Sequence, residues 1–132
     1  MRRKSREMAL QSLFQSEFAP QINIRDLIST SEIMDVDQES LKYAQELVDG
    51  IREKKSEIDS RIQKASQHWK MDRMASVDRN ILRLSVYEME FSAQPIQPAV
   101  VINEAIEIAK IFGTSDSASF INGILDQIRK GH

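Results

Sequence analysis

The amino-acid sequence predicts an all-α protein in which residues 1–132 form a single compact bundle of six or seven helices. Apolar residues recur three and four positions apart along most of the chain and rarely alternate, which is the pattern of helices that bury one side. Only four glycines and three prolines interrupt the 132 residues, so turn signals are sparse. A chain of this length fits one domain with a sizeable core, and no repeat, linker or low-complexity segment divides it.

The first half of the chain predicts four helices. The first spans roughly residues 4 to 18, with an inward side formed by Leu10, Leu13, Phe14 and Phe18. A short second helix is expected around residues 24–30. Asp37 is a candidate N-cap for a long third helix, which includes Gly50 and has the apolar positions Leu41, Ala44, Leu47, Val48 and Ile51. Ser56 and Asp59 are placed to start a fourth helix, whose apolar side consists of Ile58, Ile62 and Ala65.

The second half predicts three more helices. Ser76 is the candidate N-cap of VDRNILRLSVYEMEF, which is apolar on two sides and is therefore expected at the centre of the bundle. Its apolar positions are Val77, Ile81 and Leu84 on one side and Leu82, Val86 and Met89 on the other. Pro98 and Gly113 bracket the next helix, because proline is favoured at the first helical position and glycine just after the last. The final helix is expected to begin near Ser115 or Asp116 and to point five side chains inward: Ala118, Ile121, Ile124, Leu125 and Ile128.

The composition excludes several classes of protein. No apolar run approaches the roughly 20 residues that cross a bilayer. A signal or transit peptide at the start is excluded because polar residues interrupt it, namely Glu7, Gln11, Gln15 and Glu17. The chain has no cysteine, so disulfides, thiolate metal sites and cysteine nucleophiles are ruled out, as suits a reducing cytoplasm. We therefore expect a cytoplasmic protein without a membrane segment.

Side chains for catalysis or for holding a cofactor are equally scarce. His68 and the last residue, His132, are the two histidines, and His68 with Asp72 is best interpreted as a pair on a helix surface. The four glycines lie too far apart for a phosphate-binding loop. Of two neighbouring carboxylates, Glu107 is expected in solvent and Glu104 within the bundle. We therefore predict no catalytic residue, no metal site, no cofactor and no enzymatic activity.

The start of the chain is strongly basic although the protein as a whole is slightly acidic. Arg2, Arg3, Lys4 and Arg6 lie within the first six residues, whereas the whole chain has 18 basic and 20 acidic side chains. The remaining 14 basic residues leave the rest of the chain with a formal charge near −6. Arg3 and Arg6 also extend the inward side of the first helix, so either the bundle ends there or an acidic partner covers it. A solvated, frayed end is the simpler alternative.

Phe120 is the second unusual feature of the sequence. A rotation of about 100° per residue places it roughly a quarter-turn from the inward side formed by Ala118, Ile121 and Leu125. This offset favours a partly exposed ring, and a ring packed against a neighbouring helix is the alternative. Gly123 costs its helix about 1 kcal/mol relative to alanine, which suggests a close approach to the backbone, most often by another helix.

Four blocks of the sequence stand out by their order and spacing, namely RRKSREMALQSLFQ, VDRNILRLSVYEME, VVINEAIEIAKIFG and SDSASFINGILDQI. Together they closely resemble the bacterial NusB family of transcription antitermination proteins. The resemblance covers nearly the whole chain and is strongest after Ser76. It implies an all-helical, non-enzymatic factor that pairs with NusE, a small-subunit ribosomal protein, and binds boxA-type single-stranded RNA of ribosomal RNA leader transcripts. The wider RNA polymerase antitermination complex is the setting that it implies.

The resemblance also implies the residues of two binding surfaces. The arginine-rich start of the family corresponds to Arg2, Arg3, Lys4 and Arg6, and its RNA-facing aromatic corresponds to Phe120. Basic side chains contact phosphates, and an exposed ring can stack on an unpaired base. The positions that face NusE correspond to Phe14, Asp78 and Asp116. Some relatives have tyrosine at the position of Phe14, so this chain lacks that hydroxyl group.

One alternative of another class stays open at this point. A helical adaptor that binds only proteins would use the basic start for solubility or self-association. The NusB-like domain that is fused to ribosomal RNA methyltransferases is disfavoured, because no cofactor-binding half follows residue 132. The sequence leaves open which RNA sequence is preferred and whether the free protein is a monomer or a homodimer.

Overall fold

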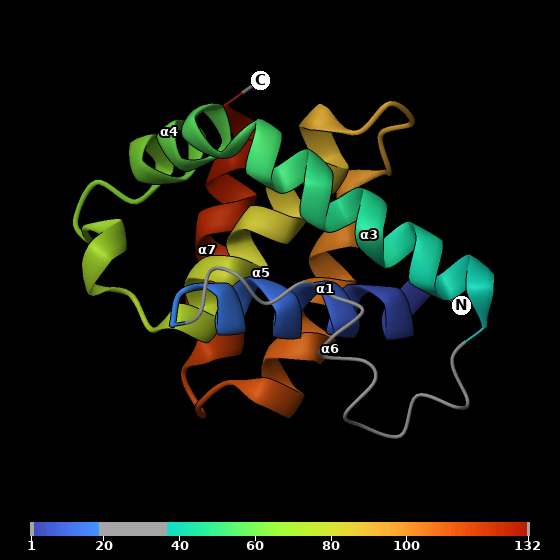
Figure 1. The fold of residues 1–132 in the computed structure, drawn as a ribbon. Helices are drawn as coiled ribbons and strands as arrows, with labels where there is room; N and C mark the ends of the chain where they lie inside the picture. The colour runs from blue at the N-terminus through green and yellow to red at the C-terminus, as the bar shows by residue number, and fades with distance from the viewer. Residues whose placement is uncertain (1, 19–36, 132) are drawn as a thin grey trace. The chain divides into compact units, whose positions relative to one another are not determined.

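The computed structural model describes residues 2–18 and 37–131, and the short helix expected around residues 24–30 lies outside this part of the chain. The described residues form six α-helices, a 3₁₀ turn and a π-helical segment, without any strand (Figure 1). The all-α class is therefore confirmed. None of the described helices is long and apolar enough to cross a membrane. Contacts divide the chain into two compact units, residues 1–49 and residues 50–132, and a single domain over the whole chain stays a prediction.

Unit 1 contains α1 (Arg2–Ser16) and the first part of α3 (Gln38–Glu53). The prediction that Phe18 lies on the inward side of α1 was wrong, because its ring is 70% exposed. The helix ends at Ser16, whose hydroxyl donates a hydrogen bond to the carbonyl oxygen of Leu13 at 2.9 Å. Helical spacing no longer applies beyond that end, and the ring of Phe18 lies instead 5.2 Å from that of Phe14.

Asp37 is the N-cap of α3, as predicted. Its Oδ1 accepts a hydrogen bond from the backbone N–H of Ser40 at 2.7 Å, and its carbonyl oxygen accepts one from Leu41 at 3.1 Å. The first bond satisfies an N–H group that has no partner inside the helix. Because it stabilises the carboxylate, the same bond lowers the pKa of Asp37 below its ordinary value of 3.8.

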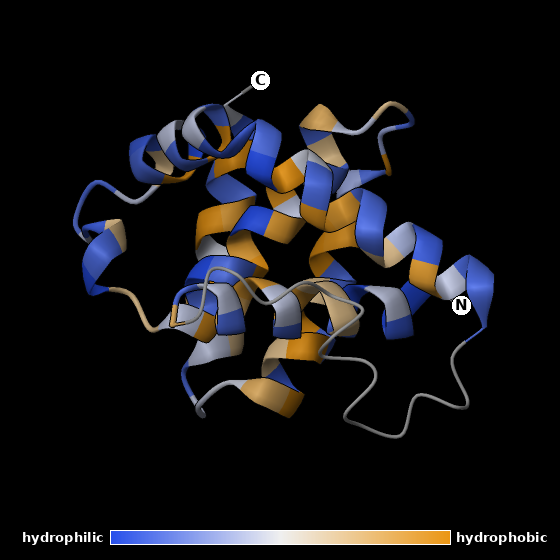
Figure 2. Ribbon diagram, in the orientation of Figure 1, coloured by the Kyte–Doolittle hydropathy of each residue, from blue (hydrophilic) through white to orange (hydrophobic). Residues whose placement is uncertain are grey.

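Unit 2 begins at Gly50 inside α3 and is built around α5. Its other elements, in chain order, are α4 (Lys55–Ala65), η2 (Met71–Arg73), α5 (Ser76–Val86), η3 (Tyr87–Phe91), α6 (Pro98–Phe112) and α7 (Ser117–Lys130). Every residue from Asn80 to Val86 is buried, and α5 contacts α4, α6 and α7 (Figure 1). The two apolar sides of this segment therefore predicted its central position correctly. Figure 2 shows that hydrophobic and hydrophilic residues are interleaved along the helices.

Most core positions expected from helical spacing are confirmed as buried. They are Leu10, Leu13, Ala44, Leu47, Val48, Ile51, Ile58, Ile62, Ile81, Leu82, Leu84, Val86, Met89, Ile121, Ile124, Leu125 and Ile128. Five expected positions are half-buried instead: Phe14, Leu41, Ala65, Val77 and Ala118. The bracketing of α6 is also confirmed, since it begins at Pro98 and Gly113 follows its last residue. Helix α7 begins at Ser117, directly after the predicted Asp116.

Two predicted helix caps were wrong. Helix α4 begins at Lys55 after a one-residue break at Lys54, so Ser56 and Asp59 are already inside the helix. Asp59 pairs with an arginine of α5 and does not cap α4. Helix α5 likewise includes Ser76 as its first residue, and the cap position before it is an alanine without a side-chain hydrogen bond.

A π-helical segment continues α5 without a loop. The backbone N–H of Ser92 donates to the carbonyl oxygen of Tyr87 at 2.9 Å, five residues back, which is the bond of a π turn. The predicted helix through Phe91 is therefore continuous but changes its winding at Tyr87. The ring of Tyr87 also occupies the space that a Cβ atom on Gly50 would need, which accounts for a glycine inside α3.

The first prediction compares two glycines inside helices. Gly50→Ala should lower the free energy of unfolding by about 1–3 kcal/mol, because the added methyl group overlaps the ring of Tyr87. Gly123→Ala should raise it by about 0.5–1 kcal/mol, because a Cβ atom there meets no described atom within 4 Å and alanine is the better helix former. Chemical denaturation measures both. Equal effects of the two substitutions would show that the Tyr87 contact does not constrain Gly50.

The second prediction concerns the N-cap of α3. Asp37→Ala should lower Tm at neutral pH because the N–H of Ser40 loses its acceptor, whereas Asp37→Asn should keep most of the stability. Folding lowers the pKa of Asp37, so its contribution is present above 3.8 and is lost as the pH falls through the folded-state value. The Tm difference between the unmodified protein and Asp37→Ala should therefore shrink below pH 3.8. A difference that stays constant with pH would contradict this account.

Candidate nucleic-acid interface

The basic residues at the start of the chain belong to a helix, because α1 begins at Arg2. Arg2 and Lys4 are exposed and Arg3 is half-buried. Arg6 differs from them, since it is only 5% exposed and has partners within the structure. Three of the four predicted cations thus reach the surface at least in part, and the fourth is enclosed in the protein.

Two contacts within unit 1 hold the first turn of α1. The guanidinium carbon of Arg2 lies 3.7 Å from the centre of the Tyr43 ring, which is a cation–π contact. The hydroxyl of Ser5 donates to the carbonyl oxygen of Ser40 at 2.8 Å. A hollow of about 370 Å³ lies beside these residues. Its lining includes two basic side chains, Arg2 and Lys42, and two acidic ones, Glu39 and Glu46, so its charge does not by itself favour a phosphate. The first turn of α1 is therefore held against α3 within unit 1, with the guanidinium group of Arg2 over the ring of Tyr43.

Phe120, the predicted RNA-facing aromatic, lies on α7 and is half-buried. Its ring meets that of Trp69 edge to face, with the ring centres 6.2 Å apart and the ring planes at 87°. Trp69 is the more accessible of the two, since 60% of its surface is exposed. The sequence reasoning missed Trp69. A signal was available, because the only tryptophan of the chain stands between His68 and Lys70 in a polar stretch.

The loop that carries Trp69 is held by the side chain of Gln63. The amide nitrogen of Gln63 donates to the carbonyl oxygen of Trp69 at 2.9 Å, and its amide oxygen accepts from the backbone N–H of Met71 at 2.9 Å. Arg79 of α5 donates to the carbonyl oxygens of Met71 and Met74, each at 2.9 Å. The backbone on both sides of Trp69 is therefore fixed, although the indole itself is exposed.

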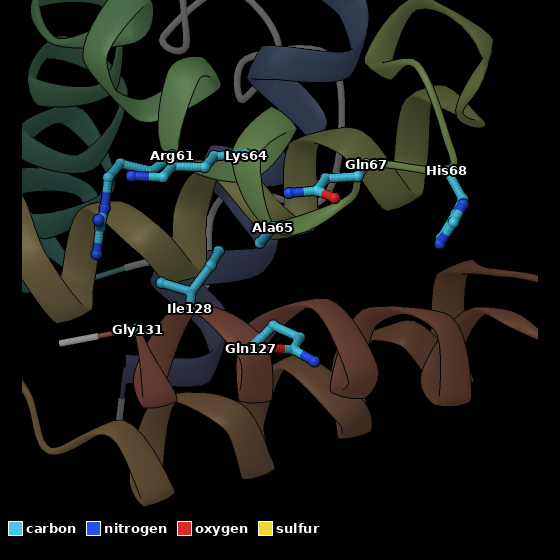
Figure 3. Close-up of a pocket in the computed structure, with 8 residues that line it drawn as sticks. All are labelled: Arg61, Lys64, Ala65, Gln67, His68, Gln127, Ile128 and Gly131. Atoms are coloured by element: carbon cyan, nitrogen blue, oxygen red, sulfur yellow. The ribbon is translucent and has the colours of Figure 1, made fainter.

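A hollow of about 390 Å³ lies between the end of α4 and the end of α7. Figure 3 shows the side chains that line it, with Lys64, Gln67 and His68 on the α4 side and Gln127 on α7. Arg61 also lines it and donates two hydrogen bonds of 2.8 Å to the carboxylate of Glu90 in η3. This pairing raises the pKa of Arg61 because it stabilises the charged guanidinium.

Three sequence interpretations in this region need correction or completion. His68 and Asp72 were expected as a pair on a helix, but His68 lies in a turn and Asp72 in η2. No helix or other described atom approaches a Cβ position on Gly123, so the expected close contact within the protein was wrong. Glu107 is exposed, as predicted, and its Oε2 lies 3.3 Å from the Nζ of Lys110. The described residues contain no cluster of histidine and carboxylate side chains that could hold a metal ion.

The predicted NusE-facing residues have different surroundings. In unit 1, Phe14 is half-buried and packs against the exposed ring of Phe18. In unit 2, Asp78 is half-buried in the first turn of α5, and its Oδ1 is buried with no hydrogen-bond partner in the described part of the chain. Asp116 is exposed at the start of α7 and forms no side-chain cap there.

The third prediction tests whether Gln63 positions Trp69. Gln63→Ala removes the hydrogen bonds to the backbone of Trp69 and Met71, so the loop should become more mobile. The fluorescence anisotropy of the single tryptophan should fall, and its quenching by acrylamide should rise. Gln67→Ala, an exposed glutamine one turn along the chain, is the matched control and should change neither value. An unchanged Gln63→Ala protein would show that the loop is held by other contacts.

Comparison with known proteins identifies the family. A family model described as "NusB family" matches residues 3–130. The chain is 55% identical to the transcription antitermination protein NusB of Bdellovibrio bacteriovorus over 131 residues, which cover 99% of this chain and 96% of the relative. It is 46% identical to the protein of the same name from Desulforudis audaxviator, with 96% and 91% of the two chains covered.

Solved structures agree with this result. The NusB structure from T. maritima aligns with a TM-score of 0.87 at 39% identity, covering 100% of this chain and 92% of the other. A chain of a solved structure of antitermination factors NusB and NusE in complex with dsRNA aligns with a TM-score of 0.83 at 29% identity, covering 99% of this chain and 97% of the other. Both the sequence match and the fold extend over almost the entire length. The chain therefore belongs to the NusB family.

Proposed function

We propose that this chain is a transcription antitermination factor that binds boxA-type single-stranded RNA of ribosomal RNA leader transcripts together with NusE. The observation that carries the proposal is membership of the NusB family, in which one solved relative forms a complex with NusE and dsRNA. The chemistry of the described residues supports it. Exposed cations on α1 suit phosphates, and a half-buried ring on α7 suits an unpaired base.

The proposed RNA contacts divide into two kinds. Arg2, Arg3 and Lys4 bind phosphates and thereby set the position of the strand, while Phe120 contributes an aromatic surface to a base. Arg6 belongs to the same set in the family resemblance, but a side chain that is 5% exposed cannot reach a phosphate without moving. Arg6 therefore serves the interface by fixing α1 from within.

The proposed NusE contacts are Phe14, Asp78 and Asp116. The paired rings of Phe14 and Phe18 give an apolar contact that another protein can cover, since Phe18 is 70% exposed. The oxygen of Asp78 that lacks a partner among the described residues costs free energy in the isolated chain. A donor from NusE would remove that cost. The factor then acts without enzymatic activity, in the cytoplasm, as one component of the wider RNA polymerase antitermination complex.

An RNA titration tests this function against that of an adaptor that binds only proteins. Anisotropy of a labelled boxA-type strand should rise weakly with this chain alone and strongly with this chain plus NusE, because the acidic body of the protein repels a polyanion until a partner adds contacts. A scrambled strand of the same length is the control. Binding of NusE without any RNA binding by the pair would overturn the proposed function and establish the adaptor.

The fourth prediction concerns the salt dependence of RNA binding. On single strands each phosphate contact contributes about 0.7 to the slope of log K against log salt, so three contacts contribute about 2. Replacing Arg2, Arg3 and Lys4 together by glutamine should therefore flatten the slope by about 2 while NusE binding is retained. The matched control neutralises three other exposed cations, Arg52, Lys55 and Lys110. If both triple variants flatten the slope equally, the start of α1 is not a specific RNA contact.

A further inference from the structure

The aromatic pair on unit 2 exposes its tryptophan more than its phenylalanine. Trp69 is 60% exposed although its backbone is fixed by Gln63, so the indole is held at the surface and does not simply lie in a loose loop. An exposed indole offers a π face on which an unpaired base can stack. The plane of the Phe120 ring lies at 87° to that of the Trp69 indole, so Phe120 packs against the indole edge to face.

Two exposed residues, Gly123 and Gln127, lie on the side of α7 that carries Phe120. Gly123 and Gln127 follow Phe120 at spacings of three and seven residues and therefore lie on the same side of the helix. A glycine in the middle of a helix costs about 1 kcal/mol relative to alanine. No described atom lies within 4 Å of a Cβ position on Gly123, so packing inside the protein does not require it. An external ligand that approaches the backbone of α7 would require it.

The charge of the surrounding surface suits a polyanion. The segment from Arg61 to Arg73 contains four basic residues and one acidic residue, although the whole chain has a net charge of −2. Arg61 is paired with Glu90, so the exposed cations of the segment are Lys64, Lys70 and Arg73. Lys64 and His68 from this segment line the hollow of about 390 Å³ together with Gln127 (Figure 3). Trp69 directly follows His68 in the chain and is itself 60% exposed.

We propose that Trp69 is the principal base-stacking residue of this surface, with Phe120 as the residue that positions its indole and Gly123 as the point where the RNA backbone passes over α7. The inference rests on the proposed function, because it takes single-stranded RNA as the ligand. It changes the role of Phe120 from direct stacking to support. It also makes unit 2 a second RNA contact with its own cations, independent of the cations on α1.

The expected affinities distinguish the two rings. Trp69→Ala should weaken binding of a labelled boxA-type strand to the complex with NusE by about 5- to 150-fold, the range for stacking of one base. Trp69→Phe should restore most of that loss, because a smaller ring still stacks. Gly123→Gln should weaken RNA binding at least 5-fold by occupying the open surface, with Tm unchanged or raised. The control Ile111→Ala, which trims another exposed apolar side chain of unit 2, should leave RNA affinity unchanged.

A second measurement does not depend on any substitution. The chain has one tryptophan, so labelling with 5-fluorotryptophan gives a single ¹⁹F resonance that reports only on Trp69, whatever NusE contains. This resonance should shift when RNA saturates the complex and should not shift when NusE alone is added. A resonance that responds to NusE and not to RNA would mean that a protein covers Trp69, which overturns the inference.

The outcomes separate this inference from the proposed function. If the unmodified complex binds RNA but Trp69→Ala binds equally well and the ¹⁹F resonance is unchanged by RNA, the inference is wrong and the proposed function stands. If the unmodified complex fails to bind RNA at all, the proposed function fails and this inference fails with it. A Trp69→Ala protein that unfolds leaves the ¹⁹F titration of the unmodified sequence and the Gly123→Gln variant to decide the matter.

Discussion

Charged side chains buried on α5 and η3 need partners inside unit 2, and the arrangement of that unit depends on this requirement. Arg83 is 8% exposed, and its guanidinium donates to both carboxylate oxygens of Asp59 on α4 at 2.8 and 3.1 Å. The Asp59 side chain is 28% exposed, so the pair is partly buried, and removing one partner would leave the other charge poorly solvated. Arg61 and Glu90 form the same two-bond arrangement between α4 and η3. Helix α4 is thus tied to the central helix at two points along its length.

The position of the candidate RNA surface follows from those ties. Once α4 is fixed, its residue Gln63 is fixed as well. The loop that follows α4 then forms hydrogen bonds with both the nitrogen and the oxygen of the Gln63 amide. Arg79 holds the far end of that loop from α5. The exposed indole of Trp69 is therefore presented by a rigid backbone beside Phe120. A preorganised ring loses little conformational entropy when a base stacks on it, which favours binding.

Electrostatics explain why a slightly acidic protein can bind RNA. The net charge of −2 opposes a polyanion at long range, and at physiological salt this repulsion is screened within about 8 Å. Local charge then decides the contact. Basic residues gather at the start of α1 and again between Arg61 and Arg73, each in a segment with few carboxylates. Such a protein binds RNA through patches, and a partner that adds contacts has a large effect on affinity.

The sequence by itself determined most of the described helices, most of the core and the family. Periodicity of three and four residues depends only on local geometry, so it correctly located α5 at the centre and correctly placed the ends of α6 at Pro98 and Gly113. It also predicted the Asp37 cap, because a cap joins residues three apart in the chain. Only the tertiary structure decided that Arg6 is enclosed, that Asp59 pairs with α5, and that Trp69 stands beside Phe120. Those facts join residues up to 51 positions apart, and a local pattern carries no information about contacts between such distant segments.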